Sequence, residues 1–194
     1  MDEDLQVIEK FKRGDKDSFT FLINKYKKPV VNLIYRFTGN FRDSEDLAQE
    51  VFLRAYRGLD KFESRSSFFT WLYTITMNLC LRSREKENRV IIQSLNQKQE
   101  DGSLDRDMDA LSQGNPVEES VEGSETAQAV RKAVMELPPN ERMAVILHRY
   151  EDKSYEEIAE VLGISISAVK SRLHRARESL REKLEGIAFQ KGGK

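Results

Sequence analysis

The stretch SYEEIAEVLGISISAVKSRLHRAR, residues 154–177, predicts two helices joined by a tight turn. Ser154, with Glu157 three residues later, has the pattern of a capping box, which marks the start of a helix. Gly163 can adopt the left-handed conformation that ends this first helix, and Ser165 can cap the helix that follows. A short helix, a turn with glycine and a second helix together predict a helix-turn-helix.

The second of these helices has two chemically different faces. Its apolar stripe consists of Ile166, Val169, Leu173, Ala176 and Leu180. The opposite face carries short polar and basic side chains, and we expect it to contact DNA through Ser167, Lys170, Ser171, His174 and Arg175. Serine and histidine can reach base edges, and lysine and arginine can reach guanine edges or phosphates. A solvated amphipathic helix is the alternative, but the preceding helix and turn favour DNA binding.

The rest of the chain is also helical in pattern, and no run combines the strand period with hairpin turn residues. Helices are expected near 3–13, 17–39, 42–62 and 66–89, and on both sides of Pro138-Pro139. Pro29 should kink or split the second helix, and Gly39 should end it. The expected N-terminal caps are Asp17 or Ser18 for the second helix, Asp43 or Ser44 for the third and Asn140 after the prolines.

Charge is unevenly spread, although the formal net charge is only -1. Residues 1–89 hold 17 Lys and Arg against 14 Asp and Glu, residues 90–125 hold 2 against 9, and residues 126–194 hold 13 against 10. The middle block has few large apolar residues, so we interpret 90–125 as a flexible acidic linker. The prediction is therefore an all-α protein of two small helical domains, 1–89 and 126–194, of which the second contains the helix-turn-helix.

Several classes of protein are disfavoured by the composition. No apolar run reaches 18 residues, and the acidic N-terminus lacks the apolar core of a signal peptide, so a cytoplasmic protein is expected. The single cysteine, Cys80, lies in an apolar helical pattern and cannot form an internal disulfide. Two histidines, one cysteine and no glycine-rich phosphate loop or metal-ligand spacing argue against an enzyme, a metal site or a cofactor.

Two segments resemble conserved regions of bacterial RNA polymerase sigma factors. RDSEDLAQEVFLRAYRGLDKF (42–62), followed by SSFFTWLYTITMNLCLR (66–82), is similar to their second conserved region. LPPNERMAVILHRYEDKSYEEIAEVLGISISAVKSRLHRARESLREKL (137–184) is similar to their fourth. The short chain, with no domain between these regions, resembles the extracytoplasmic-function (ECF) group. The resemblance implies a promoter-specificity factor that binds core RNA polymerase and promoter DNA, with no small-molecule substrate.

The resemblance also assigns residues to three surfaces. It implies contact with the clamp helices of core polymerase through Asp46, Gln49, Glu50 and Leu53. It implies recognition and opening of the minus-ten element by Phe62, Ser64, Arg65, Ser66, Ser67 and Asn78. It gives the minus-thirty-five element to the face of the helix-turn-helix described above, with Arg149 or its neighbour His148 as a further phosphate contact. It also implies that this domain docks on the polymerase flap tip.

Two alternatives concern the linker and the function. The linker is either a plain tether, which composition favours, or an acidic strand in a basic channel, which the resemblance favours because relatives thread it through the RNA exit path. The resemblance also implies control by an anti-sigma factor that covers the polymerase-binding faces. The rival function is a stand-alone helix-turn-helix regulator whose N-terminal domain senses a ligand or dimerises; a pull-down with core polymerase separates the two.

Overall fold

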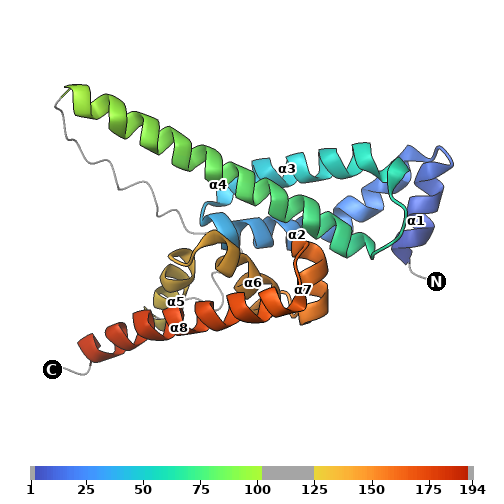
Figure 1. The fold of residues 1–194 in the computed structure, drawn as a ribbon. Helices are drawn as coiled ribbons and strands as arrows, with labels where there is room; N and C mark the ends of the chain where they lie inside the picture. Colours follow the sequence, from blue (N-terminus) through green and yellow to red (C-terminus); the bar gives the residue numbers. More distant parts are fainter. Residues whose placement is uncertain (1–2, 102–124, 192–194) are drawn as a thin grey trace.

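The computed structural model describes residues 3–101 and 125–191, which form helices, turns and no strand. Helices α1 to α4 make one group, and α5 to α8 make a second group that lies against α2 and α4 (Figure 1). The prediction of an all-α fold is confirmed. None of the described helices is long and apolar enough to cross a membrane.

The N-terminal domain is built from α1 (Glu3–Lys12), α2 (Phe19–Thr38), α3 (Phe41–Gly58) and α4 (Phe68–Asp101). Two short 3-10 turns, Lys16–Ser18 and Leu59–Lys61, connect these helices. Helix α2 continues through Pro29 as one element. Its apolar stripe meets those of α1, α3 and α4 in a core whose fully buried side chains include Phe11, Leu22, Leu33, Val51 and Leu72.

The boundary between α2 and α3 differs from the prediction. Gly39 ends α2 with φ +77°, as its sequence position indicated. Asn40 then caps α3 at once, because its side chain accepts hydrogen bonds from the backbone N–H groups of Arg42 and Asp43. Asp43 and Ser44 are therefore inside the helix, and their assignment as caps is wrong. Ser44 is fully buried and donates to the carbonyl of Asn40 at 2.5 Å.

The C-terminal domain contains the predicted helix-turn-helix. Helix α7 (Tyr155–Leu162) begins with the capping box, in which the backbone N–H of Ser154 donates to Glu157 Oε2 at 2.8 Å and the N–H of Glu157 donates to Ser154 Oγ at 3.1 Å. Gly163 ends it with φ +62°. Ser165 caps α8 (Ile166–Lys191) by accepting from the N–H of Ala168 at 3.1 Å.

Two more helices support this motif from behind. They are α5 (Glu125–Met135) and α6 (Pro139–Arg149), and both contact α8. Helix α6 begins directly at Pro139, whose fixed φ suits the first helical position. Asn140 lies in the first turn, so its assignment as the cap is wrong.

The predicted linker begins too early in the sequence. Helix α4 continues to Asp101, so the first twelve residues of the interval 90–125 are helical. Composition misplaced this boundary because polar, charged residues are also good helix formers. Residues 102–124, on which the tether and RNA-channel alternatives depend, lie outside the described part of the chain.

The two domains pack directly on each other. Most buried apolar residues of both domains belong to one continuous cluster. Between α4 and the C-terminal domain, Tyr73 Oη donates to Glu151 Oε2 at 2.9 Å and Thr74 Oγ1 donates to the carbonyl of Val161 at 3.2 Å. Burial raises the pKa of the Tyr73 hydroxyl and that of Glu151, although the hydrogen bond from Tyr73 opposes the rise at the carboxylate.

Arg142 of α6 joins three helix ends at this interface. It is 3% exposed, and its guanidinium donates to the carbonyls of Phe37 at 2.8 Å and Leu137 at 3.0 Å, and also to that of Met135. These carbonyls belong to the last turns of α2 and α5 and to the residue pair that follows α5, where backbone acceptors have no helical partner. Burial lowers the pKa of Arg142 to about 10, which still leaves it charged at neutral pH.

Candidate DNA-binding and polymerase-binding surfaces

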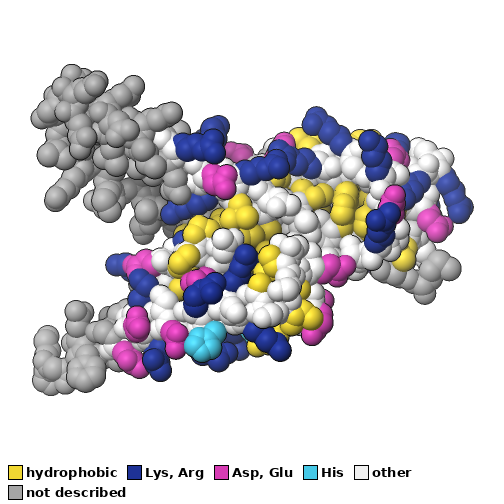
Figure 2. All heavy atoms as spheres, viewed as in Figure 1, with side chains coloured by type: hydrophobic (Ala, Val, Ile, Leu, Met, Phe, Trp, Pro, Cys, Tyr) yellow, Lys and Arg dark blue, Asp and Glu magenta, His cyan; other side chains and the backbone are white. Residues whose placement is uncertain are grey.

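Helix α8 presents the predicted polar face to solvent. Ser167, Lys170, Ser171, His174 and Arg175 are all exposed on the same side of the helix. Most of the opposite stripe is inside the domain, since Val169, Leu173 and Ala176 are buried, although Ile166 at the first position is 39% exposed. In Figure 2, Lys and Arg side chains lie along α8 and across the face formed by α3 and α4.

We call Ser167, Lys170, Ser171, His174 and Arg175 the recognition face. Contacts with other residues hold the side chains of this face to different degrees. Arg175 Nε donates to Glu141 Oε1 of α6 at 2.8 Å. His174 Nδ1 lies 3.4 Å from Glu178 of its own helix. Ser171 Oγ donates back to the carbonyl of Ser167 at 3.0 Å, and Lys170 makes no ion pair with any described residue. The face therefore combines an arginine held by an ion pair with a lysine that has no ion-pair partner among the described residues.

Arg149 is exposed at the end of α6, in the last turn of that helix. Its neighbour His148 is less available, because its Nδ1 lies 3.1 Å from the carbonyl of Lys153 and its ring packs on Tyr155 at 5.2 Å between centroids. Of these two exposed side chains, that of His148 is thus held by contacts within the domain.

The loop before α4 is partly core and partly surface. Phe62 is 4% exposed and packs against Phe68 and Trp71, with ring centroids 6.2 and 5.2 Å away. Its assignment as a DNA contact is corrected, since an aromatic ring in this cluster cannot stack on a base without unpacking the domain. The sequence could not separate the two roles, because aromatic residues serve equally in cores and in base stacking.

The polar residues of this loop lie on the surface. Ser64 takes a left-handed conformation with φ +54° and is exposed. The Arg65 side chain is 86% exposed and lies 2.6 Å from Glu63, and Ser66 is half-buried. Ser67 caps α4, since its Oγ accepts from the N–H of Thr70 at 3.1 Å. The geometry therefore supports an exposed turn, anchored at its end by a helix cap.

Asn78 lies ten residues after the start of α4 and is exposed. Its assignment to the minus-ten surface, like that of the turn 63–67, stays a prediction. Cys80, two residues later, is 1% exposed, and burial raises the pKa of its thiol to about 12. The cysteine is therefore structural, and the reactive thiolate is scarce at neutral pH.

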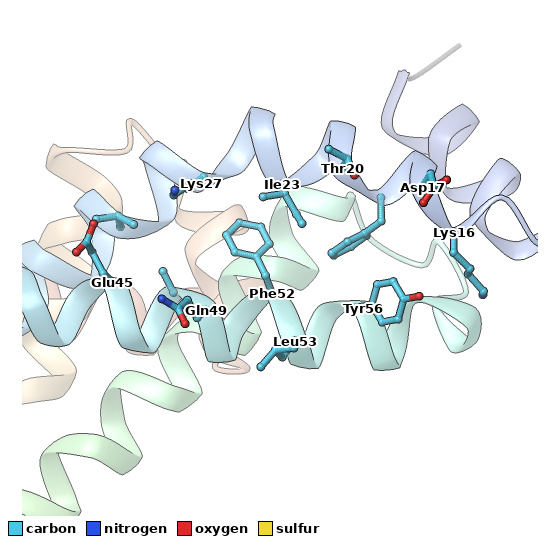
Figure 3. A pocket seen from close by; sticks show the side chains of 13 residues that line it. Lys16, Asp17, Thr20, Ile23, Lys27, Glu45, Gln49, Phe52, Leu53 and Tyr56 are labelled. Carbon is cyan, nitrogen blue, oxygen red and sulfur yellow. The ribbon is translucent and has the colours of Figure 1, made fainter.

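A groove of about 680 Å³ runs between α2 and α3, and we call it the α2–α3 groove. Gln49 and Leu53 line it, as shown in Figure 3, and Leu53 is 49% exposed. Asp46 is exposed and Glu50 is 2.6 Å from Arg54 on the same helix, but neither lines the groove. Of the four predicted polymerase contacts, the structure thus brings two to the groove and leaves two on its outer side.

Sequence reasoning missed other residues of this groove. Helical spacing puts Tyr56 on the same stripe of α3 as the buried Phe52 and Ala55, yet Tyr56 is 41% exposed and lines the groove. Its ring is held edge-on by Phe11 and Phe19 at 5.2 and 5.3 Å, which explains why helical spacing placed it inside. Helix α2 contributes Ile23 and Lys27 to the opposite wall, and only tertiary packing could bring them beside α3.

Two family models match the chain. Sigma-70 region 2 covers residues 22–90, which include the α2–α3 groove, the turn and Asn78. Sigma-70 region 4 covers residues 127–180, which include the helix-turn-helix. Together they span more than half of the chain.

The chain is similar to the ECF RNA polymerase sigma factor SigW of Bacillus subtilis (strain 168), with 34% identity over 181 residues, 93% of this chain and 96% of that protein. The chain belongs to the ECF sigma factors. This ECF factor is also 34% identical over 191 residues to the RNA polymerase sigma-H factor of Pseudomonas aeruginosa, covering 96% of each chain. As a sigma factor it directs promoter-specific transcription.

A solved structure agrees with the fold of this ECF factor. The sigma factor RpoE of Bartonella quintana, in complex with the anti-sigma factor NepR, superposes with a TM-score of 0.67 and 28% sequence identity. The superposition covers 86% of this chain and 96% of that one. The similarity therefore extends across both helical domains.

Proposed function

We propose that this ECF factor divides promoter recognition between its two domains, each of which also contacts core RNA polymerase. The observation that carries the proposal is the recognition face of α8, which is exposed, polar and basic and stands on a packed helix-turn-helix. A helix of this kind fits the major groove of duplex DNA. Ser167, Lys170, Ser171, His174 and Arg175 contact the minus-thirty-five element, and Arg149 contacts a nearby phosphate.

The N-terminal domain takes the minus-ten element. The exposed turn with Ser64, Arg65, Ser66 and Ser67, together with Asn78, offers hydroxyl, amide and cationic groups to an unstacked strand. The buried Phe62 supports the turn from inside and makes no contact with DNA in this proposal.

The α2–α3 groove and the adjoining face of α3 receive the clamp helices of core polymerase. Leu53 supplies an exposed apolar contact, and Gln49, Asp46 and Glu50 supply polar contacts around it. An apolar centre with a polar rim is the usual anatomy of a protein interface. The C-terminal domain docks on the flap tip of the polymerase.

The remaining parts of the proposal follow from this role. The factor acts in the cytoplasm with the polymerase and carries out no catalytic step of its own. Since a relative is solved in complex with the anti-sigma factor NepR, an anti-sigma protein is proposed as an inhibitor here as well. The domains for these tasks are 1–101 and 125–194, with the segment between them as a connection.

Runoff transcription with purified core polymerase and a promoter library tests the proposal. Transcripts should start only when the chain is added, and they should depend on two separated promoter elements. Leu53→Arg should abolish binding to core polymerase in a pull-down, while the selectivity of the C-terminal domain for DNA should stay unchanged. No association with core polymerase, combined with tight binding of the isolated chain to one DNA site, would support the stand-alone regulator instead.

A further inference from the structure

Arg175, on the recognition face, is held by a residue from another helix. Its Nε donates to Oε1 of Glu141 at 2.8 Å, although the two residues are 34 positions apart. The Glu141 side chain is 13% exposed, whereas that of Arg175 is 59% exposed. The less exposed carboxylate thus binds the Nε side of the guanidinium. The two terminal nitrogens of Arg175 make no hydrogen bond to any described residue.

Glu141 is itself fixed in position. It lies in the first turn of α6, where the helix dipole favours a carboxylate. The next residue, Arg142, is 3% exposed and anchors the start of α6 to the backbone carbonyls of Phe37 and Leu137. Helices α6 and α8 are also locked together by buried side chains, which include Ala144, Leu147, Val169, Leu173 and Ala176.

The other two basic side chains of the recognition face are held differently. Lys170 makes no ion pair with any described residue, and His174 pairs only with Glu178 of its own helix. A lysine ammonium on a flexible stem acts as a point charge, whereas a guanidinium with a fixed Nε presents two donors in a set direction. Supporting contacts of this kind hold a recognition group in its productive geometry.

We propose that Glu141 is a positioning residue that directs the terminal nitrogens of Arg175 toward O6 and N7 of one guanine in the upstream promoter element. Lys170 contacts a phosphate instead. The inference rests on the proposed function, because it requires the recognition face to enter the major groove. A bidentate arginine is the commonest specific contact to guanine, and it needs both donors in a fixed plane. The upstream element of this ECF factor therefore contains a guanine whose recognition depends on a residue that does not touch DNA.

Transcription by the holoenzyme from promoters randomised through the upstream element tests this inference. The unaltered chain should prefer guanine at one position by about 5- to 150-fold, as expected for a bidentate contact. Glu141→Met and Arg175→Ala should both lose that preference at the same position, and the double variant should lose no more than Arg175→Ala alone. Glu141→Gln keeps an acceptor oxygen and should retain the preference, whereas Arg175→Lys lacks Nε and should not.

Two controls separate positioning from general damage. Glu136→Met removes another ion pair to α8, that with Lys183 at 2.5 Å, and should leave the guanine preference unchanged. Lys170→Ala should lower transcription from all sequences and reduce the slope of binding against salt by about 1.

Three results have distinct meanings. If Glu141→Met keeps the preference that Arg175→Ala loses, Glu141 does not position the arginine and the inference is wrong. A uniform loss from Arg175→Ala over all sequences also overturns it, because Arg175 is then a phosphate contact. If the unaltered chain supports no transcription with core polymerase, the proposed function itself has failed, which the preceding two outcomes do not imply.

Discussion

Replacing Tyr73 with phenylalanine is expected to loosen the packing of the two domains. The hydroxyl of Tyr73 on α4 donates to Glu151 of the C-terminal domain at 2.9 Å, and the Tyr73 side chain is fully buried. The substitution removes one oxygen and keeps the ring, so the N-terminal core stays filled. What changes is that a half-buried carboxyl group loses its donor.

The size of the effect follows from that unpaired group. Leaving a buried acceptor without its hydrogen bond costs about 1–3 kcal/mol. We call molecules with packed domains closed and molecules with separated domains open. Each 1.4 kcal/mol changes an equilibrium constant tenfold, so the ratio of closed to open molecules should fall about 5- to 150-fold. Thr74 and Arg142 still form hydrogen bonds between the domains. The substitution should therefore weaken the packing of the domains without abolishing it.

In the proposed function Asn78 and Ser167 contact two separate promoter elements, and the packed arrangement of the domains holds these two residues too close together for that. Asn78 is one helical turn, roughly 6 Å, from Thr74, which touches Val161 at 3.2 Å. Ser167 is six residues beyond Val161 and therefore at most about 22 Å further. These residues thus lie within roughly 40 Å of each other, whereas elements about 25 base pairs apart are separated by roughly 85 Å of B-form DNA. Simultaneous reading requires the domains to separate.

Energy transfer between dyes on the two domains measures this separation. Cysteines replacing the exposed Arg57 on α3 and Glu182 on α8 carry the dyes. Cys80 should not compete for them, since it is 1% exposed and the pKa of its thiol is raised to about 12. The Tyr73→Phe chain should show a larger population at long distance than the unaltered chain, in the absence of polymerase.

Tyr56→Phe is the matched control, since it removes a hydroxyl from a residue that is 41% exposed and far from the domain contact along the chain. It should leave the distance distribution unchanged. The reasoning is refuted if Tyr73→Phe also leaves the distribution unchanged while the unaltered chain shows a measurable open population, because the hydrogen bond then contributes nothing to closure.

Three further predictions concern single residues. Burial raises the pKa of Glu151 above its ordinary value of 4.5, so the packed form of the two domains binds the proton more tightly than the separated form. The contribution of Glu151 to packing should be fully present below pH 4.5 and be lost as pH rises through the raised pKa, and Glu151→Gln should remove this pH dependence of energy transfer. Ser154→Ala removes half of the capping box and should lower the free energy of unfolding by about 1 kcal/mol in urea titrations, with an unchanged value counting against a role for the cap. Leu53→Ala should weaken binding to core polymerase by about 1–2 kcal/mol in a titration, without changing the unfolding midpoint, because Leu53 is 49% exposed; equal affinity would exclude Leu53 from the interface.

The helix-turn-helix could be predicted closely because its signals are local. Ser154 with Glu157, Gly163 and Ser165 each satisfy backbone groups within three or four residues, so the sequence pattern and the structure coincide. The boundary of α4 was predicted poorly for a related reason. A charged helical segment and a charged linker can have the same composition, so composition could not predict where α4 ends. The helix extends to Asp101, beyond the predicted end.

The candidate surfaces divide in the same way. Helical periodicity alone placed Ser167, Lys170, Ser171, His174 and Arg175 on one exposed face, because 3.6 residues per turn fix which side chains share a side. Periodicity could not decide whether Phe62 is core or surface, since it lies in a loop where no period applies.

The all-α class, the helix-turn-helix and the exposed face of α8 could be derived from the amino-acid pattern, since they depend on capping, turn residues and helical spacing. Contacts between residues far apart in the chain emerge only when the helices pack: Glu141 with Arg175, Tyr73 with Glu151, and α2 with α3 around the groove. The physical reason is that local hydrogen bonds are specified by neighbours along the chain, whereas contacts between helices depend on how their buried side chains fit together.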